Sequence, residues 1–160
     1  RGIFILLSDK MASAYSNLKK ETVEIEMLIS KAMELTSVKN IKFNINTALS
    51  LSVDVVKSSI AIKNLIENAE KYSPVGSDVL ITTGETSSEI IISVVDAGPG
   101  IPKNQLDKIT KAFVRIGEKK RGGFGLGLSI CRKVMEAHGG RLTIKNNKLV
   151  GSCFSLHFPK

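Results

Sequence analysis

The sequence reads NLIENAEKYSP over residues 64–74, DAGPGIP over residues 96–102 and GGFGLGLS over residues 122–129. These three segments, in this order, say more about the fold class than any other part of the chain. An asparagine pair one helical turn apart precedes an acidic turn between glycines, and a glycine-rich segment then runs into a helix. Each segment has a separate chemical use, and together they predict a nucleotide pocket.

The asparagine pair can hold a metal ion. Asn64 and Asn68 are four residues apart, so they share one face of a helix, and Lys71 follows one turn later. Amide oxygens are ligands that Mg²⁺ accepts, and a lysine so placed can meet a phosphate. Two asparagines on a helix are, taken alone, more often a solvated face. The neighbouring glycine segments favour the pocket.

The acidic turn suits an amine, and the glycine-rich segment suits a phosphate. Asp96 ends an apolar strand beside two glycines, where its carboxylate can accept from an exocyclic amine such as that of adenine; a capped turn is the alternative. A helix that begins in residues 122–127 presents free N–H groups to an anion. This segment lacks the lysine of a P-loop and does not follow a strand of a βαβ unit.

Composition limits the function classes. The 160 residues carry a net charge of +8, with 42% hydrophobic and 5% aromatic residues. Nucleic-acid binding is disfavoured because the cations are scattered and not interleaved with aromatics; the densest cluster, 119–121, also suits a phosphate. No stretch approaches the roughly 20 apolar residues of a membrane span. Cys131 and Cys153 are far apart, which favours reduced core thiols in a cytoplasmic protein.

Hydrophobic periodicity predicts an α+β fold, in which a mixed, mostly antiparallel sheet carries its helices on one face. In the helix expected over 58–72 the inward residues are Ile62, Leu65, Ile66 and Ala69. Glycines 139–140 should close the helix that precedes them. We expect helices over 25–33, 58–72, 102–109 and 126–138, and strands over 41–45, 79–85, 90–96, 141–145 and 153–158.

The N-terminal residues form a short heptad seam. Its apolar positions follow a 3-4-3-4 spacing and comprise Phe4, Leu7, Met11, Ala14 and Leu18. The segment is either an amphipathic helix folded onto the domain or the end of a dimerisation helix, which we favour because the polar residues 17–21 resemble a linker. We therefore expect a boundary between residues 1–21 and a domain at 22–160.

The three segments, in this order and spacing, resemble the catalytic and ATP-binding domain of bacterial sensor histidine kinases. That domain belongs to the superfamily of gyrase, heat-shock chaperone and MutL ATPases. Residues 64–74 resemble its N box, 96–102 its first glycine box, and 122–130 with the later HGG its second; Asp54 matches the acidic residue before the N box. The resemblance implies a two-layer Bergerat-type fold and implies ATP and Mg²⁺ as ligands.

The resemblance also assigns site residues. Asn68 is the implied magnesium ligand, with Asn64 beside the triphosphate, Lys71 on a phosphate and Tyr72 against the nucleotide. Asp96 is the implied adenine acceptor, and Arg115 is implied to steady the γ-phosphate, so that Asn64, Lys71 and Arg115 serve the transfer step. The remaining implied nucleotide contacts are Gly98, Gly100, Ile101, Phe113, Gly123, Gly125, Leu126 and Gly127, and residues 110–124 are the implied lid.

Three functions compete. The first is an ATP-dependent histidine kinase, the second is an ATP hydrolase or an anti-sigma-type serine kinase, and the third is a degenerate binding module. Hydrolases of the superfamily have a glutamate where this chain has Asn64, and an amide cannot take a proton from water. Asn68, Asp96 and the glycines speak against degeneracy, so we favour the kinase.

Neither histidine fits a phosphoacceptor, because His138 and His157 are not followed by an acidic residue. The kinase interpretation therefore implies an acceptor outside this chain, on the protein's own dimerisation and phosphotransfer domain. It also implies a homodimer in the full-length protein and a response regulator as partner. The expected location is the cytoplasmic part of an inner-membrane sensor, with no nucleic-acid partner.

Overall fold

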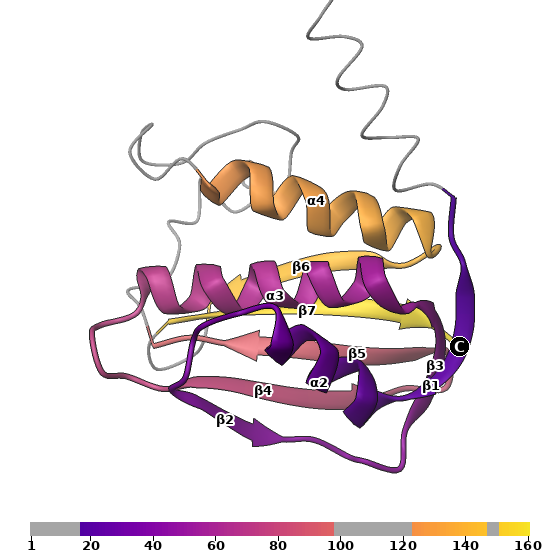
Figure 1. The fold of residues 1–160 in the computed structure, drawn as a ribbon, viewed down its shortest axis with the longest axis horizontal. Coiled ribbons are helices and arrows are strands. Elements are labelled where there is room, and N and C mark those ends of the chain that lie inside the picture. The colour runs from indigo at the N-terminus through magenta and orange to yellow at the C-terminus, as the bar shows by residue number, and fades with distance from the viewer. Residues whose placement is uncertain (1–16, 98–122, 147–150) are drawn as a thin grey trace, which may run out of the picture.

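The fold is taken from a computed structural model that describes residues 17–97, 123–146 and 151–160, with backbone alone at 72 and 123–126 (Figure 1). Ten helices and strands lie within these ranges, in the order given next. They are β1 (Lys20–Glu24), α2 (Ile25–Glu34), β2 (Ile41–Asn44), β3 (Ser50–Asp54), α3 (Val55–Tyr72), β4 (Val79–Glu85), β5 (Glu89–Val95), α4 (Gly123–Ala137), β6 (Arg141–Asn146) and β7 (Ser152–Pro159).

A five-stranded mixed sheet forms one layer and the helices form the other. Its strand order is β2-β4-β5-β7-β6, in which β2 and β4 are parallel and the other neighbours are antiparallel. The helices α2, α3 and α4 lie on one face of this sheet, and β1 and β3 pair as a separate antiparallel ribbon (Figure 1). The predicted α+β class, with its mostly antiparallel sheet and one-sided helices, is confirmed.

Period-two and helical patterns place the core between these layers. In β5 the residues Ile90, Ile92 and Val94 are buried and alternate with half-buried neighbours. The stripe predicted for the central helix is confirmed, because its four members have no exposed surface. These four side chains, all on α3, are Ile62, Leu65, Ile66 and Ala69.

The ends of α3 are set by polar side chains. Asp54 is its N-cap and accepts from the backbone N–H of Lys57 at 3.0 Å, which starts the helix at Val55, three residues before the predicted start. At the other end the Ser73 hydroxyl donates to the carbonyl of Ala69 at 2.6 Å, and Pro74 follows.

The β1–β3 ribbon was not predicted. Both strands are only five residues long; β1, KETVE, buries a single side chain, and β3, SLSVD, carries only two apolar residues. Lys20 and Glu21, expected in a linker, pair with Asp54 and Val53.

In β2 the predicted half-buried strand is wrong for Phe43, which is 49% exposed because β2 is an edge strand. The helix expected over 102–109 and the heptad segment lie outside the described residues.

The last helix begins three residues earlier than predicted and ends at Ala137, one residue before the predicted end. Its first turns contain glycines, which disfavour a helix by about 1 kcal/mol each, so the sequence carried no helix signal there. At its C-terminus Gly139 has φ of 76°, and its N–H donates to the carbonyl of Glu136 at 3.0 Å. The N–H of Gly140 donates to the carbonyl of Met135 at 2.8 Å. These two bonds form a Schellman motif.

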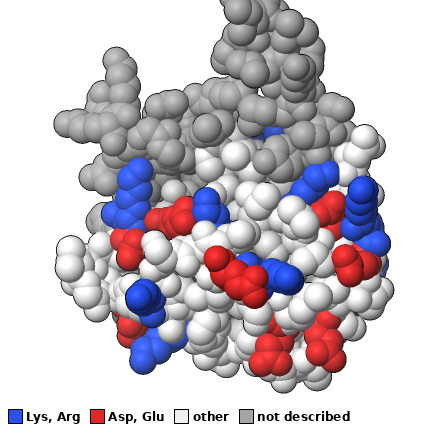
Figure 2. Space-filling model, in the orientation of Figure 1, with Lys and Arg blue, Asp and Glu red and all other residues white. Residues whose placement is uncertain are grey.

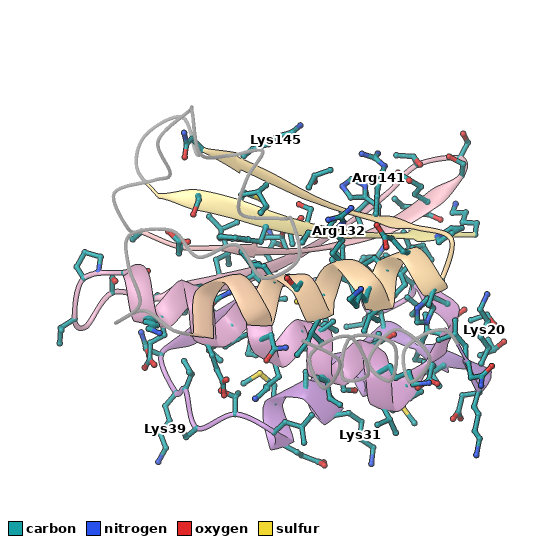
Figure 3. The ribbon with its side chains drawn as sticks, turned by 90° about the horizontal axis from the view of Figure 1, so that it is seen from above. Lys20, Lys31, Lys39, Arg132, Arg141 and Lys145 are labelled. Atoms are coloured by element: carbon teal, nitrogen blue, oxygen red, sulfur yellow. The ribbon has the colours of Figure 1, made fainter. Side chains whose placement is uncertain are left out.

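Charges of both signs are spread over the surface. Figure 2 shows cationic and anionic side chains interspersed on the face that carries the helices. The cations labelled in Figure 3 belong to several different elements. They are Lys20 of β1, Lys31 of α2, Lys39 before β2, Arg132 of α4, and Arg141 and Lys145 of β6. Within the described ranges no helix is both long and apolar enough to cross a bilayer.

The close approach of α4 to β7 generates a stability prediction. A Cβ at Gly140 would lie 2.0 Å from the carbonyl oxygen of His157, so Gly140→Ala should lower the free energy of unfolding by about 1–3 kcal/mol or more. Gly84→Ala is the control, because the nearest atom to its Cβ is 4.0 Å away on Ile91. Denaturant unfolding of both variants measures the difference, and equal stabilities would contradict this close approach.

Candidate functional site

The site lies where the asparagine pair of α3 meets the start of α4. A Cβ built on Gly127 would be 3.9 Å from Nδ2 of Asn68 and 4.0 Å from Cβ of Asn64. Because Gly127 has no side chain, nothing at this position of α4 fills the space beside the two asparagines. Two segments that are about sixty residues apart in sequence are thus brought together.

Asn68 carries an unsatisfied polar atom. The residue is only 7% exposed, and its Nδ2 has no hydrogen-bond partner among the described residues. A buried amide without a partner costs about 1–3 kcal/mol, so such a group is retained where a ligand completes it. Its Nδ2 can donate to a phosphate or water oxygen, and a rotation of the amide presents Oδ1 to a cation.

Asp96 is held at the end of β5 by the first residue of β7. The carboxylate is 5% exposed; Ser152 donates to it from its hydroxyl at 2.7 Å and from its backbone N–H at 3.1 Å. The N–H of Asp96 donates back to the carbonyl of Ser152 at 2.9 Å. No local pattern in the sequence marks Ser152, because its bond to Asp96 depends on the pairing of β5 with β7.

A second glycine makes this contact possible. Gly151 has φ of 87°, and a Cβ there would lie 1.9 Å from the carbonyl oxygen of Asp96. The N–H of Ala97 donates to the hydroxyl of Ser73 at 3.2 Å, just beyond the end of α3. The turn that starts at Asp96 is therefore tied both to β7 and to the helix that carries Asn64 and Asn68.

The other predicted residues divide into two groups. Lys71 is exposed in the last turn of α3, where it also lines a hollow of about 420 Å³ with Lys39, Glu70 and residues 73–77. The backbone of Tyr72 ends α3, and the backbones of residues 123–126 form the first turn of α4. Outside the described residues lie Gly98, Gly100, Ile101, Phe113, Arg115 and the cluster 119–121.

The donor set fits a magnesium ion that arrives with a nucleotide. Within residues 17–97, 123–146 and 151–160, no three His, Cys, Asp or Glu side chains are grouped to hold a metal. Mg²⁺ is commonly held by one or two protein oxygens together with phosphates and waters. The Asn68 amide, beside Asn64 and without a partner for its nitrogen, matches that requirement.

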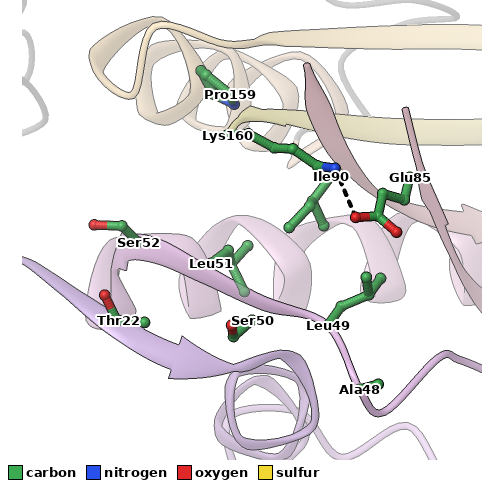
Figure 4. A pocket seen from close by; sticks show the side chains of 10 residues that line it. All are labelled: Thr22, Ala48, Leu49, Ser50, Leu51, Ser52, Glu85, Ile90, Pro159 and Lys160. Atoms are coloured by element: carbon green, nitrogen blue, oxygen red, sulfur yellow. Dashed lines mark hydrogen bonds and ion pairs between the residues drawn. The ribbon is translucent and has the colours of Figure 1, made fainter. Parts of the chain in front are cut away.

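Another hollow lies at the opposite end of the sheet (Figure 4). It has a volume of about 380 Å³ and is lined by the β1–β3 ribbon, the β4–β5 hairpin and the end of β7. The Nζ of Lys160 is 2.7 Å from the carboxylate of Glu85 at its rim. Ile90 borders it near the start of β5, whereas Asp96 follows the end of that strand, so this hollow is separate from the candidate site.

The two histidines have structural partners. Nε2 of His157 is 2.8 Å from Oγ1 of Thr143, and its Nδ1 is 3.2 Å from Oε1 of Glu89. The pKa of Glu89 is lowered by its hydrogen bond from Arg141 and, after that, by His157. Nδ1 of His138 is 2.8 Å from the carbonyl of Val134.

The thiols match the expected reduced pair. Cys131 and Cys153 are free cysteines. Cys131 is fully buried on α4, and burial raises the pKa of its thiol to about 12. Its Sγ donates to the carbonyl of Ala61 on α3 at 3.2 Å.

Comparison with known proteins identifies the family. The model of the histidine kinase-, DNA gyrase B- and HSP90-like ATPase family matches residues 54–160. The sensor protein KdpD of Clostridium acetobutylicum is 32% identical over 98% of this chain, which covers 18% of that protein. The adaptive-response sensory kinase SasA of Rippkaea orientalis is 34% identical over 82% of this chain, which covers 33% of that protein.

Solved structures show the same fold. The nucleotide-free catalytic domain of histidine kinase ThkA aligns with a TM-score of 0.76 and 27% identity, over 89% of this chain and 98% of that one. Full-length ShkA in complex with AMPPNP aligns with a TM-score of 0.79 and 26% identity, over 94% of this chain and 33% of that one.

This chain therefore belongs to the histidine kinase-, DNA gyrase B- and HSP90-like ATPase family. Within that family its fold is the one seen in histidine kinase catalytic domains, and the relatives named above are sensor kinases. The chain spans a third or less of those two curated relatives.

The support given to Asp96 generates a second prediction. Ser152→Ala leaves one buried carboxylate oxygen without its hydroxyl donor, so the free energy of unfolding should fall by about 1–3 kcal/mol. Ser50→Ala, at an exposed position on β3, should change it by less than about 0.5 kcal/mol. Denaturant unfolding measures both, and a Ser152→Ala protein as stable as the Ser50→Ala control would refute the assigned support.

Proposed function

We propose that this chain is the ATP-binding catalytic domain of a two-component sensor histidine kinase, which transfers the γ-phosphoryl group of ATP to a histidine outside the chain. The observation that carries this proposal is the buried amide nitrogen of Asn68, which has no partner among the described residues and lies beside Gly127 at the junction of α3 and α4. Family membership and the kinase relatives support it independently.

Two ends of one pocket bind the nucleotide in this proposal. Asp96 accepts from the adenine amine, and Ser152 orients its carboxylate through two hydrogen bonds. Asn64 and Asn68 face the triphosphate with the N–H groups at the start of α4, and Lys71 adds a positive charge one turn beyond Asn68. Asn68 would hold Mg²⁺, which supplies charge neutralisation at the phosphate oxygens.

The transfer step asks little covalent chemistry of this chain. The bond between the γ-phosphorus and the bridging oxygen breaks, ADP departs, and a phosphorus–nitrogen bond forms with an acceptor imidazole, which releases its proton. The chain contributes positioning and electrostatic stabilisation through Asn64, Asn68 and Lys71. Arg115 enters this proposal through the sequence resemblance alone.

Asn64 favours transfer over hydrolysis. It lies beside Asn68 and near Gly127, at the position where hydrolases of the superfamily place a carboxylate. A carboxamide does not take up a proton from an attacking water, so the site holds ATP without activating water. Neither His138 nor His157 is available as acceptor, because both rings are buried and hydrogen-bonded.

The rest of the parent protein completes the proposal. The acceptor histidine lies in its own dimerisation and phosphotransfer domain, and the full-length protein is a homodimer that passes the phosphoryl group to a response regulator. We place the domain in the cytoplasm, as part of an inner-membrane sensor. The sensor kinases among its relatives support these assignments.

Removing the Asn68 amide should separate binding from stability. In Asn68→Ala the nucleotide-free protein should unfold within about 1 kcal/mol of wild type, because the amide nitrogen makes no hydrogen bond within the described residues. Its stabilisation by Mg²⁺–ADP should fall by about 1–3 kcal/mol. Thermal melts with and without Mg²⁺–ADP measure both effects.

Ser59→Ala is the matched control, because Ser59 Oγ is also buried on α3 without a partner among the described residues, and Ser59 lies five positions before Asn64, toward the start of the helix. It should keep the full stabilisation by Mg²⁺–ADP. If Asn68→Ala keeps it as well, the asparagine pair does not bind the metal–nucleotide complex.

A phosphotransfer assay tests the reaction class. With radiolabelled ATP and Mg²⁺, the chain alone should acquire no acid-labile, base-stable phosphate, because it lacks an acceptor. A separately prepared dimerisation and phosphotransfer segment should become labelled, slowly because the covalent tether is absent. Acid-labile labelling of the chain alone would place the acceptor within it, and rapid release of inorganic phosphate would favour a hydrolase.

A further inference from the structure

His138 joins the end of α4 to the start of α3. It is 4% exposed, its Nε2 accepts from the backbone N–H of Asp54 at 3.0 Å, and the hydroxyl of Ser58 lies 3.4 Å from the same nitrogen. Its Nδ1 donates to the carbonyl of Val134 at 2.8 Å, and the ring meets the edge of Phe158 at 5.5 Å between centroids. These bonds require a neutral ring with the proton on Nδ1.

Asp54 links this contact to the residues just before β1. Its carboxylate accepts from the backbone N–H of Lys57 at 3.0 Å and of Lys19 at 2.9 Å, ahead of β1. His138 therefore acts on a residue that caps α3 and anchors the chain before the β1–β3 ribbon. We call Asp54 and His138, joined by this hydrogen bond, the clamp.

The clamp and the candidate site lie at opposite ends of one antiparallel helix pair. At one end His138 meets Asp54, midway Cys131 donates to the carbonyl of Ala61, and at the other end Gly127 faces the asparagine pair. Between Gly127 and His138 the helix extends about 16 Å. Because α4 is continuous from Gly123 to Ala137 and contacts α3 at its middle, we expect a change at the clamp to alter how its first turns lie against α3.

We propose that His138 is a positioning residue for nucleotide binding: its neutral imidazole fixes the end of α4 to α3 and so holds the first turns of α4 against Asn64 and Asn68. This inference rests on the proposed nucleotide site. No separate contact between His138 and the nucleotide is involved.

Protonation of His138 opposes the clamp. A proton on Nε2 would place two donors, the ring N–H and the Asp54 N–H, against each other. Burial lowers the pKa of His138, the carbonyl of Val134 and the carboxylate of Asp54 act in the raising direction, and the charges of Lys20 and Lys57 lower it further. As pH falls below the ordinary histidine value of about 6.5, the unfolded chain takes up this proton before the folded one, so stability falls.

Nucleotide affinity at two pH values tests the proposal on the whole 160-residue chain. Calorimetry with Mg²⁺–ADP compares wild type, His138→Gln, His138→Phe and His157→Gln at pH 7.5 and 5.5. The glutamine oxygen can still accept from the Asp54 N–H but does not titrate, whereas phenylalanine cannot accept. His157→Gln is the matched control, since the ring of His157 bonds to Thr143 and Glu89 on the sheet and not to Asp54.

We expect His138→Gln to bind within about twofold of wild type at pH 7.5, and His138→Phe to bind roughly three- to tenfold more weakly. Between pH 7.5 and 5.5, wild type and His157→Gln should lose roughly three- to tenfold more affinity than His138→Gln. Changes in ADP ionisation are common to all four proteins and cancel in this comparison.

A titration of the wild-type protein checks the same coupling without substituting His138. Because linkage is reciprocal, saturating Mg²⁺–ADP should move the NMR titration midpoint of His138 to lower pH by about 0.5–1. His157→Gln assigns the signal, because the chain has two histidines.

Equal pH dependence in wild type and His138→Gln, or an unmoved midpoint on saturation, would overturn the role of His138 while leaving the nucleotide site intact. Absence of Mg²⁺–ADP binding by wild type at pH 7.5 would instead overturn the proposed function, and the positioning role with it.

Discussion

The packing of α3 against α4 is the contact on which the rest of the structure depends. One stripe of α3 is buried entirely against the sheet, so its polar pair must turn toward the seam with α4. Asn64 and Asn68 then face Gly127, where the absence of a side chain leaves room between the helices. The seam exists only when the sheet supports both helices, because an isolated helix with this composition would leave the apolar stripe in water.

Two aspartates end strands on opposite sides of the domain and are used differently. Burial raises the pKa of Asp54, but bonds from the backbone N–H groups of Lys19 and Lys57 outweigh burial and lower it. The carboxylate of Asp54 therefore caps α3. Asp96 instead accepts two hydrogen bonds from Ser152, the first residue of β7, and these bonds orient its carboxylate. The same residue type at similar places thus serves architecture in one case and recognition in our proposal for the other.

Sequence patterns identified elements that bury a continuous apolar face, such as α3, β4 and β5. They did not identify the β1–β3 ribbon, because each strand is only five residues long, β1 buries only Val23, and the partner strand is about thirty residues away. The three chemical segments were visible because Asn64, Asn68 and Asp96 sit in short local motifs. Ser152 and the clamp at His138 were not, because a hydrogen bond between residues 56 or 84 positions apart leaves no local signal.

The buried thiol of Cys131 makes the α3–α4 seam accessible to kinetic measurement. A thiol whose pKa is about 12 is almost entirely protonated near neutral pH, and the side chain has no exposed surface. An alkylating reagent can therefore reach it only when α4 lifts from α3, while Cys153 lies half-buried on the sheet. The rate of modification at Cys131 then reports how often the two helices separate, so this thiol is a natural probe of local opening between α3 and α4.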